Sequence, residues 1–347
     1  MAAACLAALS SGVARALPSW LEQSADFESA LQRLLDGDLI EEVEEQSEPA
    51  SALVAPMFDD WFGPAALYHY ASRWSGVIAR DEVPTDARSA AESFDASRSA
   101  FEAQTQARGE PPPHFPDRGD LEHAVELPRV EATPFDALLA ARETHRLFDQ
   151  DAALELDEFA LLLQRTFGAR AVAALGGGLS ALRKSSPSGG GMHPIEAYPL
   201  VVNVRGLTSG WYHYRAGEHR LAPLRVLSRE AARDAIAHLT AGQAYFATAP
   251  LLIALTLRYP RHHWKYPQHG RALRVMQLET GHLGQTFYLS ATEAGLGAFF
   301  TAAINDADID AMLGLDGIEE GCVAVVGCGR PAADGAALRL SSYSSPV

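Results

Sequence analysis

A glycine-rich segment, KSSPSGGGMHPIEAY at residues 184–198, is the first place where residue types and spacing could serve chemistry. Consecutive glycines permit left-handed backbone and the close approach of another group to the chain. The residues that follow, IEAYPLVVNV, are rich in β-branched and aromatic side chains, which predicts a strand. A loop anchored on a strand is a frequent position for binding groups, although a plain surface turn is the alternative.

A second segment, HHWKYPQHGR at residues 262–271, concentrates side chains that exchange protons. Lys265 and Lys184 are the only lysines in a chain with 28 basic residues, and a lysine can lose its proton where an arginine cannot. Neighbouring side chains of an extended segment point to opposite sides, so Lys265 and Tyr266 reach one substrate only if the backbone turns. Pro267 favours such a turn. The alternative is a surface lysine beside a core tyrosine.

The segment RETHR, at residues 142–146, could bind an anion. The preceding residues, ATPFDALLAA, predict a helix that continues into this segment. Arg142 and Arg146 would then lie on one helical face, because they are four residues apart. Two guanidinium groups in an acidic chain are suited to a phosphate. Surface arginines paired with Glu143 or Asp149 are the alternative.

Other common sites are disfavoured by residue spacing. The glycine-rich stretches match neither G-x-x-x-x-G-K-[ST] nor a G-x-G-x-x-G that opens a helix, which argues against a P-loop and a Rossmann dinucleotide site. A flavin ring would still suit such a loop, because glycine lets backbone donors and acceptors approach its edge. Adjacent His262 and His263 point to opposite sides, and Glu279 with His282 lacks the further carboxylates of a di-iron site, so we expect no metal. No G-x-S-x-G is present, so serine-hydrolase chemistry has no anchor.

Composition narrows the class of protein. The 347 residues are 48% hydrophobic, enough for a large core, and carry a net charge of −16, which argues against general binding of nucleic acid. No apolar run approaches the roughly 18–20 residues of a membrane helix, and the N-terminus lacks the basic region of a signal peptide. Cys322 and Cys328 lie in one predicted strand, roughly 20 Å apart, so together with Cys5 they are expected to be free thiols. We therefore expect a cytoplasmic protein.

The elements that must position these residues fall into three parts. Residues 1–102 are acidic and mostly helical in pattern, which predicts a small winged-helix-like N-terminal domain. Residues 103–125 contain a cluster of prolines and are expected to form a linker. Residues 126–347 alternate between helix and strand patterns. They include an amphipathic helix over 154–168, a glycine-rich connector at GGGLS, a hairpin over 209–224, a buried strand in APLLIALTLRY, a long helix over 270–297 and a final core strand in GCVAVVGCGRP.

Taken in order, five segments resemble the flavin-dependent nitroreductase superfamily. More narrowly, they are similar to its SagB-type branch, whose members oxidise azolines to azoles in ribosomally made peptides. The segments are RETHR, SPSGGGMHPIEAYPLVVNVRGLTSGWYHY, WKYPQHGRALR, LETGHLGQTFYLSATEAGLG and VVGCGRP. The resemblance runs from about residue 135 to residue 331, and its most specific parts are SPSGG…HPIEAY and KY…GR.

The resemblance implies FMN as the cofactor and assigns residues to it. Those for the phosphate are Arg142, Thr144 and Arg146, with threonine where serine is usual, and either Arg330 or Arg339 as the last basic residue. Those for the flavin ring are Pro187, Ser188, Gly189, Gly190, Gly295, Leu296 and Gly297. The resemblance also implies that Lys265 and Tyr266 serve dehydrogenation.

The implied fold is α+β, a mixed, mainly antiparallel sheet flanked by helices, assembled as an intertwined homodimer. FMN would lie at the subunit interface, and Gly281 and Gly284 of the long helix would pack at the dimer core. The implied function is FMN-dependent azoline oxidation in a precursor peptide, with a cyclodehydratase-type maturation partner. The alternatives are an NAD(P)H-dependent nitro- or quinone reductase and a non-catalytic scaffold of a maturation complex. Small-molecule reductases need neither a large N-terminal domain nor the Lys-Tyr pair.

Overall fold

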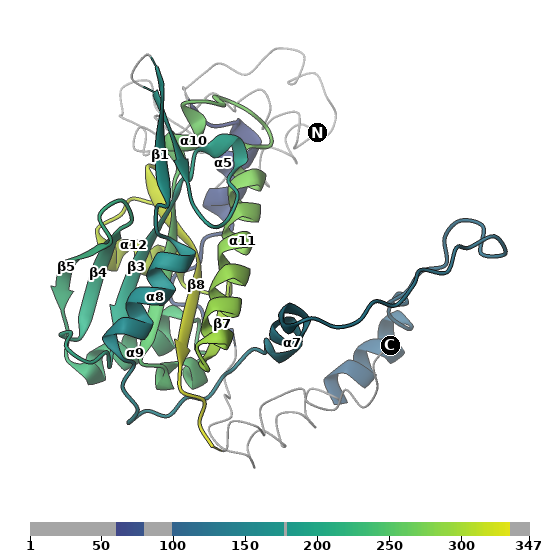
Figure 1. The fold of residues 1–347 in the computed structure, drawn as a ribbon, viewed down its shortest axis with the longest axis horizontal. Helices are drawn as coiled ribbons and strands as arrows, with labels where there is room; N and C mark the ends of the chain where they lie inside the picture. Colours follow the sequence, from purple (N-terminus) through teal and green to yellow (C-terminus); the bar gives the residue numbers. More distant parts are fainter. Residues whose placement is uncertain (1–59, 80–98, 177–178, 334–347) are drawn as a thin grey trace, which may run out of the picture.

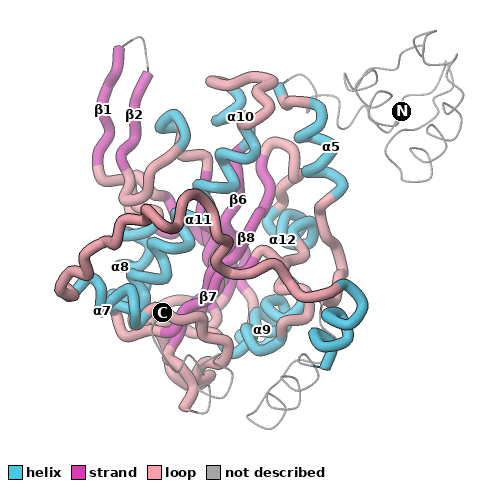
Figure 2. The backbone as a smooth tube through the Cα atoms, turned by 90° about the vertical axis from the view of Figure 1, so that its right-hand side faces the viewer, coloured by secondary structure: helices cyan, strands magenta, loops and turns pink. Residues whose placement is uncertain are grey.

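The computed structural model describes residues 60–79, 99–176 and 179–333 of the 347-residue chain. Within these ranges, helices lie on both faces of a central sheet (Figures 1 and 2). The winged-helix-like fold predicted for residues 1–102 falls largely outside the described residues, as do Cys5 and Arg339.

A six-stranded antiparallel sheet forms the centre of the molecule, in the spatial order β5-β4-β3-β6-β8-β7. Its strands are β3 (Ile195–Val201), β4 (Gly210–Arg215), β5 (Arg220–Val226), β6 (Leu251–Arg258), β7 (Gly297–Thr301) and β8 (Glu320–Gly329). The sheet and its flanking helices confirm the predicted α+β class. The predicted hairpin is β4–β5, and the strand predicted after the glycine-rich loop is β3.

The central strand β6 shows how the sheet is buried on both faces. Leu251, Ile253 and Leu255 belong to one apolar cluster, whereas Leu252 and Ala254 belong to the other. This alternation is the two-residue period of a strand. The helices over the two faces are α8 (Leu156–Thr166) and α11 (Ala272–Glu293) on the first, and α9 (Arg229–Leu239) and α12 (Asp306–Leu313) on the second. Because both faces of β6 are covered, its sequence is a nearly continuous run of hydrophobic residues.

Helix α11 is the long helix predicted from the sequence, and it ends before Gly295, whose φ of 70° is left-handed. Its Met276, Leu283 and Phe287 are buried against the sheet. The opposite face, which includes Gly281, is exposed. Helix α11 therefore packs one face on the sheet and leaves the other open.

The helix predicted to run through RETHR ends earlier, so that prediction is wrong. Helix α7 (Pro134–Ala141) begins at a capping box formed by Thr133 and Asp136 and ends at Arg142, whose ψ of 115° is extended. The chain then runs beside β7: the His145 N–H donates to the carbonyl of Ala298 at 2.8 Å. Pairing with a strand about 150 residues later in the chain overrides the local helical preference.

The GGGLS segment is not a plain connector. Its described residues lie in the two strands of a projecting antiparallel hairpin, Gly176 in β1 (Ala171–Gly176) and Leu179 with Ser180 in β2 (Leu179–Arg183), visible in Figures 1 and 2. All six residues of β1 are exposed. Since neither face of the hairpin packs on the core, its sequence carries no alternation of apolar and polar residues.

Two stretches of the N-terminal third differ in their contacts with the sheet domain. Helix α5 (Gly63–Ala71) lies in the part of the chain predicted to be mostly helical, and its flanking Trp61 belongs to the main apolar cluster. Residues 99–108 are helical, so the helix enters the predicted linker, and residues 109–133 then project from the body as an exposed arm (Figure 1). No helix within the described ranges is long and apolar enough to cross a membrane.

Candidate active site

The glycine-rich loop and the Lys-Tyr segment meet at Gly190. The ammonium of Lys265 donates to the carbonyl oxygen of Gly190 at 2.9 Å. A Cβ at Gly190 would collide with the hydroxyl of Tyr266, and its φ of 65° is left-handed, so both the contact and the backbone require glycine here. The two predicted catalytic residues and one predicted ring-binding residue therefore form one cluster.

The backbone turns at the Lys-Tyr segment, as the sequence predicted. Helix α10 (Tyr259–His263) leads into it, and the N–H groups of Lys265 and Tyr266 both donate to the carbonyl of His262, at 3.2 and 3.1 Å. The buried His262 ring lies 5.0 Å from the ring of Tyr266, measured between centroids. Lys265 itself is exposed. The turn brings both side chains to the same loop although they are adjacent in sequence.

The glycine-rich loop is held against α11 at two points, Val275 and Thr286. The Ser186 hydroxyl lies 2.7 Å from that of Thr286, and a Cβ at Gly189 would collide with Val275. The Ser188 hydroxyl accepts a hydrogen bond from the His193 N–H at 2.8 Å. The Ser188 side chain thus braces the loop from within, and it also hydrogen-bonds to the carboxyl group of Glu279 on α11.

A buried carboxyl group, which the sequence suggested only as a rejected metal ligand, lies behind this loop. Glu279 of α11 is 3% exposed, and one of its oxygens is 3.8 Å from Nδ1 of His193. Burial raises the pKa of Glu279 and lowers the pKa of the half-buried Lys184 nearby. Burial also lowers the pKa of His193. Three groups that can exchange protons therefore lie under the loop, and sequence spacing alone gave no sign that they converge.

Two of the predicted phosphate-binding residues, Arg142 and Thr144, contact Tyr288 toward the C-terminal end of α11. The guanidinium carbon of Arg142 lies 5.4 Å from the Tyr288 ring centroid, and the Thr144 hydroxyl is 2.9 Å from the Tyr288 hydroxyl. The same hydroxyl accepts from the N–H of Phe300 at 2.9 Å. Because side chains at alternate positions of extended chain share a side, Arg142, Thr144 and Arg146 leave the backbone in one direction. The sequence did not identify Tyr288, which holds this segment in place.

The segment after α11 lies at this second cluster and not at the glycine-rich loop. A Cβ at Gly297 would come within 2.6 Å of Cγ of His145, and the Leu296 side chain is buried in the core. Arg330 pairs with Glu158 of α8, and its carbonyl accepts from the Asp149 N–H at 2.9 Å. To bind an anion, the Arg330 side chain would first have to leave Glu158.

The two clusters do not form one site within a single chain. Gly189 lies against Val275 and Arg142 against Tyr288, and these two α11 residues are 13 positions, or roughly 20 Å, apart along the helix, although Ser186 at the start of the loop contacts Thr286. Between them, a shallow groove is lined by Gly281, Gly284, Gln285, Tyr288 and Phe300. A Cβ at Gly281 would meet nothing within 4 Å, whereas one at Gly284 would lie 2.6 Å from Phe300.

Metal and disulfide chemistry find little support in the geometry. Among the described residues, no group of three or more histidine, cysteine, aspartate and glutamate side chains could hold a metal ion. Cys322 and Cys328 are free and buried in β8. Burial raises the pKa of both thiols, so neither is an activated nucleophile.

Comparison with known proteins gives a family and a few relatives. The sequence model of the nitroreductase family matches residues 139–330. MJ1384 of Methanocaldococcus jannaschii, provisionally named a nitroreductase, is 28% identical over 189 residues, which are 54% of this chain and 88% of that protein. The trifolitoxin-processing protein TfxB of Rhizobium leguminosarum bv. trifolii is 33% identical over 140 residues, 39% of this chain and 36% of TfxB.

Two solved structures are similar in fold. A crystal structure of a nitroreductase-like protein from Ralstonia eutropha has a TM-score of 0.46 at 24% identity, covering 60% of this chain and 88% of that one. A chain of the E. coli microcin synthetase McbBCD complex with truncated pro-MccB17 has a TM-score of 0.46 at 18% identity, covering 68% of this chain and 92% of that one.

Proposed function

The chain belongs to the nitroreductase family, and from that premise we propose that it is an FMN-dependent dehydrogenase of SagB type that matures a ribosomally synthesised peptide. The proposed reaction is oxidation of an azoline ring to an azole. The similarity to TfxB, which is named for the processing of trifolitoxin, supports a processing role. The proposed partners are a precursor peptide and a cyclodehydratase-type enzyme that forms the azoline.

One observation carries the proposal: Lys265 and Tyr266 both contact Gly190 of the glycine-rich loop. These residues are 75 positions apart, and a surface lysine beside a core tyrosine would have no reason to meet such a loop. A positioned base with a hydroxyl beside it is what abstraction of a substrate proton requires.

The residues fit FMN in two places. The side of the extended segment that carries Arg142, Thr144 and Arg146 offers cationic and hydroxyl donors to a phosphate. The Pro187–Gly190 loop offers backbone groups to a flavin ring, and a Cβ at the neighbouring Gly191 would meet nothing within 4 Å. When bound, FMN would supply the acceptor for the hydride that leaves the azoline.

In this reaction, the protein's own side chains remove the proton. Azoline oxidation removes a proton and a hydride from neighbouring ring carbons, and we assign the proton to the amine of Lys265, with the Tyr266 hydroxyl as its partner. A lysine acts as a base only as the neutral amine, which burial favours over the ammonium. Lys265 is exposed in the single chain. We propose that the substrate peptide and a second copy of the chain cover it.

The separation of the two clusters supports a homodimer with composite sites. Roughly 20 Å of α11 lies between the arginine segment and the glycine-rich loop, so one chain does not close around a single FMN. Two copies packed antiparallel along the exposed face of α11 would bring the loop of one chain to the arginine segment of the other. The groove beside Gly281 lies at the middle of that face.

The rival function is an NAD(P)H-dependent reductase of small nitro compounds or quinones. The similarity to MJ1384, of which the chain spans 88%, favours that function over a scaffold. A scaffold would be expected to purify without bound flavin.

The test is to incubate the purified yellow protein with candidate azoline-containing peptides and to look for the loss of two hydrogens by mass spectrometry. Lys265→Ala and Tyr266→Phe are assayed in parallel, with flavin content measured for each. A positioned base contributes about 10²–10⁴-fold in rate, so we expect losses of that order with FMN retained. If both variants oxidise the peptide at the parent rate, Lys265 and Tyr266 are not the catalytic residues. Reduction of nitro compounds or quinones by NAD(P)H, with no peptide oxidised, would establish the rival.

A further inference from the structure

We propose that residues 60–79, here called the strap, position the Lys265–Tyr266 loop, and that Trp61 is its main positioning residue. The claim that the strap fixes this loop stands on contacts alone. Its consequence for catalysis rests on the proposed function. The strap precedes the family-matched residues 139–330, so it is not part of the matched unit.

Trp61 of the strap packs against the residues that precede the loop. This side chain is 3% exposed, and its ring centroid lies 4.5 Å from that of Tyr259 and 4.8 Å from that of His263. Tyr259 and His263 are the first and last residues of α10. Because the N–H groups of Lys265 and Tyr266 both bond back to this helix, the position of α10 sets theirs.

The strap also contacts the residues that follow Tyr266. The carbonyl of Asp60 accepts a hydrogen bond from the Gln268 N–H at 2.8 Å, and the Phe62 ring lies 3.4 Å from where a Cβ of Gly270 would stand. Gln268 has a φ of 50°, a left-handed conformation that a residue other than glycine holds only when its surroundings enforce it. Contacts on both sides of the loop thus come from one segment about 200 residues away in sequence.

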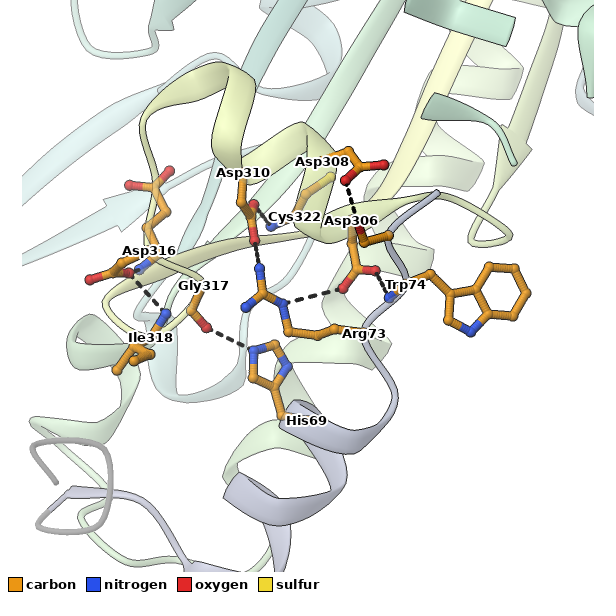
Figure 3. A network of polar contacts seen from close by, with 12 residues as sticks. His69, Arg73, Trp74, Asp306, Asp308, Asp310, Asp316, Gly317, Ile318 and Cys322 are labelled. Carbon is orange, nitrogen blue, oxygen red and sulfur yellow. Dashed lines mark hydrogen bonds and ion pairs between the residues drawn. The ribbon is translucent and has the colours of Figure 1, made fainter. Parts of the chain in front are cut away.

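The far end of the strap is anchored on α12 and β8 (Figure 3). Arg73 pairs with Asp310 at 2.6 Å and with Asp306 at 3.7 Å, and Asp310 in turn accepts from the Cys322 N–H of β8 at 2.7 Å. Asp306 also accepts from the Trp74 N–H at 2.6 Å. An ion pair tied to the central sheet holds the strap against a rigid element, which lets its other end act as a brace.

The experiment measures amide hydrogen exchange in the full-length protein, peptide by peptide. Trp61→Leu is compared with Trp211→Leu, which removes an equally buried tryptophan from the other apolar cluster. We expect Trp61→Leu to speed exchange in residues 259–271 at least tenfold relative to peptides from β6, whose residues belong to both clusters, and Trp211→Leu to leave that ratio unchanged. Trp61→Phe, which keeps an aromatic ring, should restore most of the protection.

Phe62→Ala gives a second measurement that does not depend on the core, because Phe62 is 41% exposed. It should raise exchange in residues 266–271 and leave residues 259–263 protected. If amide exchange in residues 259–271 changes only in step with global stability, and does so equally in all variants, the proposed role of the strap is wrong. Unchanged exchange in both Phe62→Ala and Trp61→Leu would also overturn it.

Turnover of azoline peptide then separates the positioning claim from the proposed function. If the loop loosens in Trp61→Leu, kcat should fall while KM and flavin content stay near parent values, and Trp61→Phe should recover kcat. A variant that merely unfolds would lose flavin and kcat together. If no peptide is oxidised even by the parent, the proposed function fails, and the exchange result still decides whether the strap fixes the loop.

Discussion

Arg142, Thr144 and Arg146 lie at alternate positions of an extended segment, so their side chains leave the chain on one side. That geometry offers a phosphate two guanidinium groups and a hydroxyl together. Replacing either arginine with alanine should weaken FMN retention by about 1–3 kcal/mol, the range for charge-assisted hydrogen bonds. Flavin content after dialysis reports this loss, with Arg215→Ala as a control, since Arg215 pairs only locally with Glu218. Full flavin content in the double variant would contradict the assignment.

His263 gives a second prediction at this scale, on pH. Burial lowers its pKa from 6.5 to about 4, and its Nδ1 has no hydrogen-bond partner among the described residues. The unfolded chain therefore binds a proton between pH 6.5 and pH 4 that the folded chain does not, so stability falls as the pH drops through this window. At pH 4.5 the loss is on the order of 2 kcal/mol for this one group.

His263→Phe removes that titration and keeps a ring beside Trp61. Urea unfolding at pH 7 and pH 4.5 should show a smaller difference in unfolding free energy for the variant than for the parent. Burial also raises the pKa of Asp310 to about 7, which acts in the opposite direction over the same window, so only the comparison between proteins isolates His263. Equal differences in both proteins would show that His263 titrates normally.

At the scale of elements, the glycine-rich loop offers a matched pair of substitutions. Gly190 and Gly191 both have left-handed φ, 65° and 69°, but a Cβ meets Tyr266 only at Gly190. Alanine should cost roughly 1–2 kcal/mol of backbone strain at either position. Only Gly190→Ala should also displace Tyr266 and lower the dehydrogenation rate beyond the effect of Gly191→Ala. Equal rates in the two variants would show that the Tyr266 contact has no part in turnover.

The elements differ in how far the sequence could predict them. Strand β6 and helix α11 each bury a continuous or periodic set of side chains, so their own residues carry the signal. The course of residues 142–146 depends on β7, and strand β1 is exposed along its whole length, so neither left a local pattern. The roles of Tyr288, Glu279 and Trp61 arise from contacts between distant segments. Sequence patterns show which residue types are present, but not which distant residues they contact in the fold.

At the scale of the whole molecule, the open face of α11 predicts a second subunit. A Cβ at Gly281 would meet no described atom within 4 Å, whereas one at Gly284 would collide with Phe300, so Gly281→Leu is the better test of the interface. We expect it to shift the protein toward monomer in light scattering and to lower flavin content. Gly217→Leu, at another open glycine in the β4–β5 turn, is the control. If the Gly281→Leu variant remains dimeric and keeps its flavin, the interface does not lie at Gly281.

The composite site itself makes the most demanding prediction, because it assigns the two clusters of each active site to different chains. One variant carries Arg142→Ala and Arg146→Ala, the other Lys265→Ala and Tyr266→Phe, and each alone should be inactive. In a mixed dimer, one site combines both defects and the other combines the intact arginine segment of one chain with the intact Lys-Tyr pair of its partner. Random pairing makes half the dimers mixed, each with one working site of two, so co-expression should restore roughly a quarter of parent activity. If each chain instead built its own site, no combination would contain an intact one, and the co-expressed protein would remain inactive.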